Sequence, residues 1–128
     1  MRLLLDTHAL LWFGLDDRRL NATARGLIED PANEIAISPA SYWEIAIKIG
    51  LGKYALTEPY QPFFEQVIAD YGLQIIPIEI RHTSLLISLP LHHRDPFDRL
   101  LIAQAIAEGI PIVSNDEHFD AYPVTRLW

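Results

Sequence analysis

The sequence predicts a three-layer α/β/α fold with a central parallel sheet of four to five strands. Short, mainly apolar runs alternate with longer segments whose apolar residues recur at helical spacing. Half of the residues are hydrophobic and the mean hydropathy is +0.12, which is typical of a protein with a packed core. The 128 residues suffice for one domain, and strands that alternate with helices form parallel sheets covered on both faces.

The first half of the chain predicts two strands and three helices. Arg2–Leu5 is an apolar run that ends at an aspartate, which is typical of a buried strand. A glycine closes the helix expected over Thr7–Gly14, and an asparagine caps the helix expected over Ala22–Glu29. Ile35–Ile37 is the second buried strand. A Ser-Pro pair then opens a long helix, Ser38–Leu51, which ends among glycines.

The second half continues the alternation. Pro59–Tyr71 is expected to be helical, and Leu73–Ile76 is the third strand. A proline closes a helix over Ile80–Leu89. After one more helix, Ile110–Ser114 forms the fourth strand and Val124–Leu127 a short edge strand. No repeat, linker or low-complexity segment interrupts residues 1–128, so we expect a single domain.

The composition excludes several classes of protein. Without cysteine there are no disulfides and no thiolate chemistry, so a metal would need oxygen or imidazole ligands. No apolar run approaches the ~20 residues of a membrane span, and the first one is too short for a signal peptide, so we expect a cytoplasmic protein. The net charge of −7 disfavours gripping nucleic acid by phosphate neutralisation alone. A nucleic-acid substrate would require metal ions or a local basic patch.

The helix expected from Asp95 to Gly109 contains the most informative acid. Asp95, followed by proline, is expected to be its N-cap. Asp98 then shares one helix face with apolar residues three, four and seven positions further on, so its carboxylate is directed inward. The alternative interpretation is an ordinary first-turn acid stabilised by the helix dipole.

Three other acids occupy positions where chemistry is expected. Asp6 and Asp116 follow the first and fourth strands, at the carboxyl ends where such sheets bind ligands. Glu44 faces inward on its helix among apolar residues. Each has a structural alternative, because Asp6 and Asp116 can cap the turns that follow them and Glu44 can pair with Lys48 one turn later.

Four converging carboxylates would repel one another and raise each other's pKa values unless a divalent cation joined them. Ligand sets made of oxygen alone favour Mg²⁺ or Mn²⁺. Such an ion lowers the pKa of water and stabilises charge that develops on a phosphodiester. The sequence therefore predicts a metal site suited to phosphodiester hydrolysis.

Four segments also carry a resemblance to a known family; they are Leu4–His8 (LLDTH), Trp43–Ile45 (WEI), Asp98–Ala105 (DRLLIAQA) and Val113–Phe119 (VSNDEHF). In this order they resemble the motifs of the PIN-domain ribonucleases, most closely those of the VapC-type toxins of bacterial toxin–antitoxin pairs. The resemblance implies an RNA endonuclease that depends on Mg²⁺ (or Mn²⁺), a homodimer and a small antitoxin protein as partner.

The resemblance also implies which residues form the site. By position, the catalytic and metal-binding acids are Asp6, Glu44, Asp98 and Asp116. The supporting hydroxyl residues beside the first and last acids are Thr7 and Ser114. Asp95 is assigned to the helix cap.

Other polar residues near these motifs are open to two interpretations. Lys48, Arg94 and Arg99 are candidates to contact RNA phosphates, although Lys48 and Arg99 can equally pair with the acids. His92 and His93 precede the helix in a polar loop, and we expect both to be solvated.

Two histidines and one apolar helix complete the candidates. His8 and His118 each follow a predicted site acid by two residues and either line the cleft or are simply exposed. The apolar run Tyr42–Leu51 is expected to lie in a dimer interface or under a partner.

Two other functions are alternatives for a chain of this size and fold. A receiver-like phospho-acceptor domain would need paired acids after the first strand and a lysine at a late strand end, yet only Asp6 ends that strand and no lysine follows Lys53. A catalytically silent binding module with the same fold is the second alternative. A metal-dependent cleavage assay on mixed RNA separates it from a nuclease.

Overall fold

The computed structural model describes all 128 residues and contains one five-stranded sheet in the order β3-β2-β1-β4-β5. The strands are β1 (Arg2–Leu5), β2 (Glu34–Ile37), β3 (Gln74–Ile75), β4 (Ile112–Val113) and β5 (Arg126–Leu127). Every neighbouring pair is parallel. The predicted parallel sheet is therefore confirmed.

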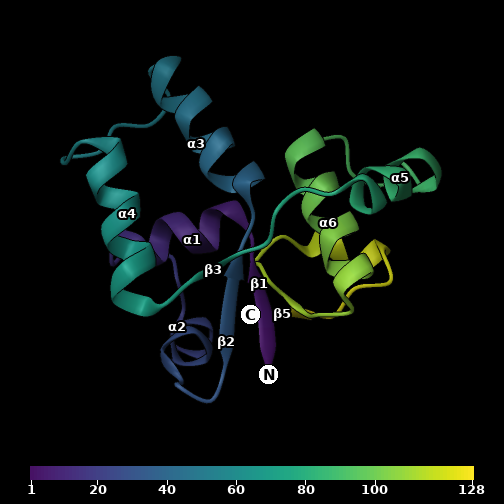
Figure 1. The fold of residues 1–128 in the computed structure, drawn as a ribbon, viewed down its shortest axis with the longest axis horizontal. Helices are drawn as coiled ribbons and strands as arrows, with labels where there is room; N and C mark the ends of the chain where they lie inside the picture. Colours follow the sequence, from purple (N-terminus) through teal and green to yellow (C-terminus); the bar gives the residue numbers. More distant parts are fainter.

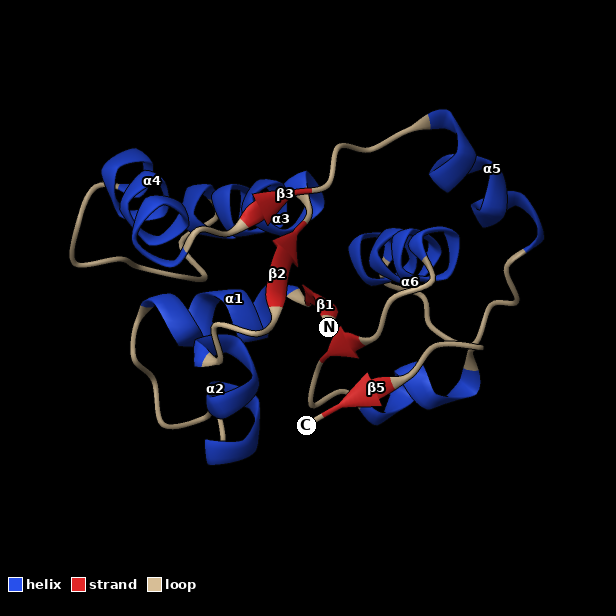
Figure 2. Ribbon diagram, turned by 60° about the horizontal axis from the view of Figure 1, so that its bottom comes forward, coloured by secondary structure: helices blue, strands red, loops and turns tan.

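Helices cover both faces of this sheet (Figures 1 and 2). They are α1 (Thr7–Gly14), α2 (Ala22–Glu29), α3 (Pro39–Gly50), α4 (Tyr60–Tyr71), α5 (Ile80–Ser88) and α6 (Pro96–Glu108), with a 3₁₀ helix, η1 (Glu117–Ala121), between β4 and β5. Figure 2 shows α1, α2 and α4 on one side of the strands and α6 with α5 on the other. The predicted three-layer α/β/α architecture is confirmed.

Two apolar cores, one on each face, explain why β1 and β2 are apolar after their first residue and why β4 is apolar throughout. In β1, Leu3 and Leu5 pack into the core under α1, α2 and α4, whereas Leu4 packs into the core under α6. All three are fully buried, because strand side chains alternate between faces and both faces are covered.

Element boundaries differ from prediction mainly at the strands. The third and fourth strands were expected over Leu73–Ile76 and Ile110–Ser114, but the ladders cover only their central residues. Pairing does not stop abruptly, since the Ile76 amide still donates to Ile37 at 2.9 Å and the Ser114 amide to Leu127 at 3.1 Å. The helices match to within about one residue at each end, as their caps dictate.

The topology brings the predicted site segments to one edge of the sheet. The strands β1, β2 and β4 are adjacent and parallel, so their carboxyl ends lie together. Asp6 follows β1, Ser38 joins β2 to α3, and Ser114 follows β4. Helices α3 and α6 contact each other above this edge. No helix is both long enough and apolar enough to cross a membrane.

Candidate functional site

Asp6 lies directly after β1 and has two roles in the structure. Its Oδ1 accepts a hydrogen bond from the Ala9 amide at 2.7 Å and caps α1, as the structural alternative expected. The side chain is buried, and this burial raises the pKa of Asp6, against the opposing effect of a hydrogen bond from Ser114. The cap therefore fixes the orientation of a buried carboxyl group at the end of β1.

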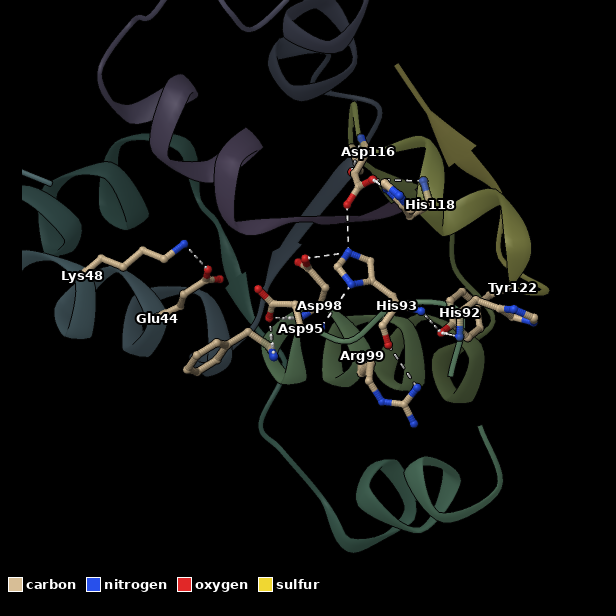
Figure 3. Close-up of polar contacts among 12 residues, drawn as sticks. Glu44, Lys48, His92, His93, Asp95, Asp98, Arg99, Asp116, His118 and Tyr122 are labelled. Atoms are coloured by element: carbon tan, nitrogen blue, oxygen red, sulfur yellow. Dashed lines mark hydrogen bonds and ion pairs between the residues drawn. The ribbon is translucent and has the colours of Figure 1, made fainter. Parts of the chain in front are cut away.

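Glu44 sits on α3 with only 3% of its surface exposed. Lys48 donates to its Oε2 at 2.8 Å, so the expected ion pair one turn along the helix is present (Figure 3). Oε1 is buried and has no hydrogen-bond partner. A buried carboxylate oxygen without a partner is costly, and a bound cation would remove that cost.

The two aspartates at the start of α6 have separate roles. Asp95 is the N-cap, and its Oδ1 accepts hydrogen bonds from the amides of Phe97 at 2.8 Å and Asp98 at 3.2 Å. The Asp98 carboxyl turns instead toward the end of the sheet (Figure 3). The predicted division between a cap and an inward acid is thus seen in the geometry.

Electrostatics shows that the predicted acids share one neighbourhood. Burial raises the pKa of Asp98 to about 8, and the negative charges of Asp95, Asp6, Glu44 and Asp116 add to the shift. Each predicted site acid therefore lies close enough to Asp98 to oppose its ionisation. The structure brings all four together from separate elements of the chain.

Asp116 caps the 3₁₀ helix η1, again as the structural alternative expected. Its Oδ1 accepts from the His118 amide at 3.0 Å and lies 2.7 Å from the His118 ring nitrogen Nδ1. Burial alone would raise the pKa of Asp116, but the hydrogen bonds from His118 and from His93 outweigh burial and lower it. Asp98 therefore favours its protonated form, whereas the adjacent Asp116 favours its charged form.

His93 contacts both of these acids, contrary to prediction. Its Nε2 lies 3.1 Å from Oδ2 of Asp98 and 2.9 Å from Oδ2 of Asp116 (Figure 3). Nδ1 accepts from the Asp95 amide at 3.2 Å, so Nε2 carries the proton and donates to the carboxylates. The expectation of a solvated loop residue is wrong for His93, whose side chain is only 16% exposed.

A distant tyrosine explains why this loop enters the site. The Tyr122 hydroxyl accepts from the amides of His92 at 3.0 Å and His93 at 2.8 Å, and donates to the Pro90 carbonyl at 2.7 Å. These bonds fix the loop against the end of η1. His92 itself is exposed, as predicted, with its ring against Tyr122.

The two supporting hydroxyl residues are buried beside the acids. Ser114 Oγ accepts from the Asp116 amide at 3.0 Å, which orients the turn that carries Asp116. Thr7 Oγ1 donates to Ser41 Oγ at 3.2 Å and so joins the start of α1 to α3. Both contacts hold the elements that present the acids.

The candidate phosphate contacts occupy different environments. Arg99 donates to the backbone carbonyls of Pro90 at 2.9 Å and Leu89 at 3.1 Å, and points away from the acids (Figure 3). It therefore holds the loop before α6. Arg94 is exposed and has no ion-pair partner, while Lys48 stays beside Glu44.

This donor set fits a divalent cation. Asp98 and Asp116 each offer a carboxylate oxygen beside Nε2 of His93, and these three atoms all lie within 4.8 Å of one another. The unpartnered Oε1 of Glu44 adds a further oxygen, and Asp6 lies close enough for its charge to add to the raised pKa of Asp98. Carboxylate oxygens suit Mg²⁺ or Mn²⁺, whereas both ring nitrogens of His93 are already engaged.

A second group of one histidine and two glutamates lies equally close together, but its polar atoms already have partners. Glu79, His82 and Glu108 lie together, yet Arg81 pairs with both glutamates. His82 Nδ1 accepts from the Glu79 amide and Nε2 contacts Glu108 at 3.1 Å, so both ring nitrogens are occupied. This group is an ion-pair network that joins α5 to α6.

Comparisons with known proteins agree with this geometry. A family model described as PIN domain matches residues 3–124. Ribonuclease VapC22 of Mycobacterium tuberculosis is 29% identical over 130 residues, which cover 98% of this chain and 97% of that protein.

Solved structures show the same fold. A structure of VapBC2 from Rickettsia felis bound to a DNA fragment from its promoter aligns with a TM-score of 0.72 at 21% identity, covering 99% of this chain and 98% of that one. FitAcB from Neisseria gonorrhoeae aligns with a TM-score of 0.67 at 17% identity, covering 98% and 96%.

Proposed function

The chain belongs to the PIN-domain family, and from that premise we propose that it is a metal-dependent endoribonuclease and the toxin of a toxin–antitoxin pair. The observation that carries the proposal is the convergence of three further predicted acids on Asp98, whose pKa is raised first by burial and then by the charges of Asp95 and of these three acids. A catalytically silent module would gain nothing from buried carboxylates that repel one another, because without a cation they cost folding free energy. The similarity to a protein named a ribonuclease supports the same activity.

The four acids are proposed to hold the metal and are Asp6, Glu44, Asp98 and Asp116. Bound among them, Mg²⁺ or Mn²⁺ would supply Lewis-acid chemistry, activating a water molecule and stabilising charge on the phosphodiester. The caps on α1 and η1 engage Oδ1 of Asp6 and Oδ1 of Asp116, which fixes both carboxylates before any ligand arrives. Such preorganisation reduces the cost of binding.

His93 is assigned a positioning role in this site. Its Nε2–H reaches Oδ2 of both Asp98 and Asp116 and directs these two oxygens into the same space. Thr7 and Ser114 support the segments that carry the acids. Among the cations, we propose Lys48 and Arg94 as phosphate contacts, whereas the Arg99 donors are engaged by backbone carbonyls.

The proposed partners are an antitoxin protein and a second copy of the chain. An antitoxin would block the site by presenting an arginine or lysine to the carboxylates, which displaces the metal and excludes RNA together. A homodimer is supported by apolar side chains left exposed on α3 and at its C-cap, where Trp43 is 57% and Leu51 is 66% exposed. We further propose that residues 1–128 act as one PIN domain in the cytoplasm.

Cleavage of mixed RNA tests the proposed activity. Wild type, Asp98→Asn and a surface control, Asp70→Asn, are compared in Mg²⁺, in Mn²⁺ and in chelating buffer. Asp70 is exposed on α4 and pairs only with Gln66, so its substitution should leave cleavage unchanged. We expect cleavage that needs the ion and is lost in Asp98→Asn. Cleavage that persists in chelator or in Asp98→Asn contradicts the proposal.

A further inference from the structure

A pocket of about 420 Å³ lies between α1 and the loop that joins α3 to α4. Its walls include His8, Trp12, Arg19, Lys53, Tyr54 and Leu56. Resting on the ribonuclease function proposed above, we propose that this pocket binds one nucleotide of the RNA strand next to the cleaved bond. Its volume falls within the roughly 300–1,000 Å³ of pockets that hold small organic ligands.

A chain of contacts leads from the acid cluster to this pocket. Lys48 Nζ lies 2.8 Å from Oε2 of Glu44 and 5.4 Å from the centre of the Tyr54 ring. The Tyr54 hydroxyl lies 3.2 Å from Nε2 of His8, which is two residues beyond Asp6. An RNA strand whose phosphate lies among the acids therefore reaches this pocket first on the side of Lys48 and His8.

Aromatic groups give the pocket flat walls that suit a base. His8 stacks on Trp12 with ring centres 5.2 Å apart and an angle of 23° between the planes. The Arg19 guanidinium covers the same indole at 5.2 Å. Tyr54 is partly exposed and faces the pocket. Bases stack on aromatic side chains and arginine planes whatever their sequence.

The charges around this pocket favour the binding of a phosphate group. The chain has a net charge of −7, yet no aspartate or glutamate lines the pocket. Lys53 has no carboxylate partner, whereas Arg19 shares its charge with Asp17 at 2.8 Å. Two other basic side chains have neither an ion pair nor hydrogen bonds to several backbone carbonyls. They are Arg18, which adjoins Arg19, and Arg94.

Binding measured without cleavage tests this proposal. A labelled short RNA that cannot be cleaved is titrated in Mg²⁺ against the wild type and against Lys53→Gln, Tyr54→Leu and Tyr54→Phe. Arg25→Gln is the charge-matched control, because Arg25 lies on α2 and pairs with Asp16. Melting curves verify that each variant is folded.

We expect Lys53→Gln to weaken RNA binding several-fold and to reduce the salt dependence by about one phosphate contact. Tyr54→Leu should weaken binding to a similar extent, Tyr54→Phe should retain most of it because the ring remains, and Arg25→Gln should have no effect. RNA substituted with 4-thiouridine should crosslink to the peptide that contains Tyr54.

Unchanged affinity in both Lys53→Gln and Tyr54→Leu, or an RNA that does not bind, overturns the proposal. Variants that lose affinity for the antitoxin but keep RNA affinity overturn it as well, and identify the pocket as a protein-binding site. The proposed nuclease activity fails separately, if the wild type binds RNA through this pocket and does not cut it in Mg²⁺ or Mn²⁺.

Discussion

The Nε2 atom of His93 lies 2.9 Å from Oδ2 of Asp116, across a separation of 23 residues. The contact joins the loop before α6 to the segment after β4. Through the same proton His93 also reaches Asp98 at 3.1 Å. One imidazole thus sets the spacing of two carboxyl groups whose charges would repel each other.

Replacing this imidazole should impair catalysis more than folding. We expect His93→Ala to lower RNA cleavage about 10- to 100-fold, the usual effect of losing a group that orients metal ligands. His92→Ala is the matched control, because that neighbouring ring packs on Tyr122 and contacts no site acid. Rates measured at saturating Mn²⁺ and at limiting Mn²⁺ separate lost affinity from lost rate. Equal activity in the two variants would remove His93 from the site.

The two aspartates at the start of α6 should respond differently to substitution. Asp95→Ala removes the cap on two amides and should cost about 0.5–2 kcal/mol of stability. Asp98→Asn should abolish cleavage while the fold stays intact, since its side chain supports no backbone bond. Thermal melting and RNase activity are measured for both. If Asp95→Ala abolishes activity with unchanged melting, the two assignments are reversed.

The raised pKa of Asp98 predicts how stability changes with pH. The folded carboxyl titrates near pH 8, against 3.8 for the ordinary group. Between these values the folded state keeps a proton that the unfolded state has released. The contribution of Asp98 to the free energy of unfolding is therefore fully present below the ordinary pKa and is lost as the pH rises toward 8. Asp6 changes in the same direction. The pKa of Asp116 is lowered, so its contribution to the stability of the fold is lost only as the pH falls below the ordinary pKa.

Melting in chelating buffer from pH 5 to pH 8.5 measures this effect. We expect the melting temperature of wild type to fall more steeply across that range than that of Asp98→Asn, which should be the more stable protein at pH 8. Asp70→Asn, on the exposed face of α4, should follow wild type. Adding Mn²⁺ at pH 8 should raise the melting temperature of wild type and not that of Asp98→Asn. Parallel curves for wild type and Asp98→Asn would contradict the raised pKa.

Metal binding is tested most cleanly at Asp6 and Glu44. Asparagine caps helices about as well as aspartate, so Asp6→Asn should keep the bond to Ala9 and lose only the charge. Glu44→Gln likewise preserves an acceptor for Lys48. In titration calorimetry with Mn²⁺, both variants should bind at least tenfold more weakly than wild type. Wild-type affinity in both would show that the ion sits elsewhere.

The fold was predictable because local rules act on every element. Mainly apolar central strands identify a sheet covered on both faces, and caps such as Ser38 and Asp95 fix where helices begin. Strand ends were less predictable, because β3 is an edge strand whose ladder depends on the register of β2 alone.

The convergence of the four acids could be expected from the sequence, but the contacts of the groups around them could not. Each acid has a local signature, such as a strand end or an inward helix face. His93 and Arg99 have none, because their positions depend on contacts with Tyr122, with Asp116 and with loop carbonyls far along the chain. Polar residues in a short loop are usually solvated, and only tertiary structure reverses that expectation here.

An acidic protein with four clustered carboxylates should not attract RNA unaided. The net charge of −7 opposes long-range attraction to phosphates, and the cations nearest the site are few: Lys48 is held by Glu44, and Arg94 stands alone. A divalent ion among the acids would replace local repulsion with attraction for a phosphate. The ion should therefore be required for RNA to enter the site as well as for hydrolysis.

Binding of a non-cleavable RNA, with Mg²⁺ and in chelating buffer at equal ionic strength, tests this requirement. We expect affinity to fall at least tenfold in chelator. Asp98→Asn weakens the proposed metal site, so it should lose less affinity than wild type when the ion is withdrawn. Asp70→Asn is the surface control, because Asp70 is exposed on α4. Undiminished affinity of wild type in chelator would mean that Lys48, Arg94 and their neighbours hold RNA without help, and that the acids repel it too weakly to matter.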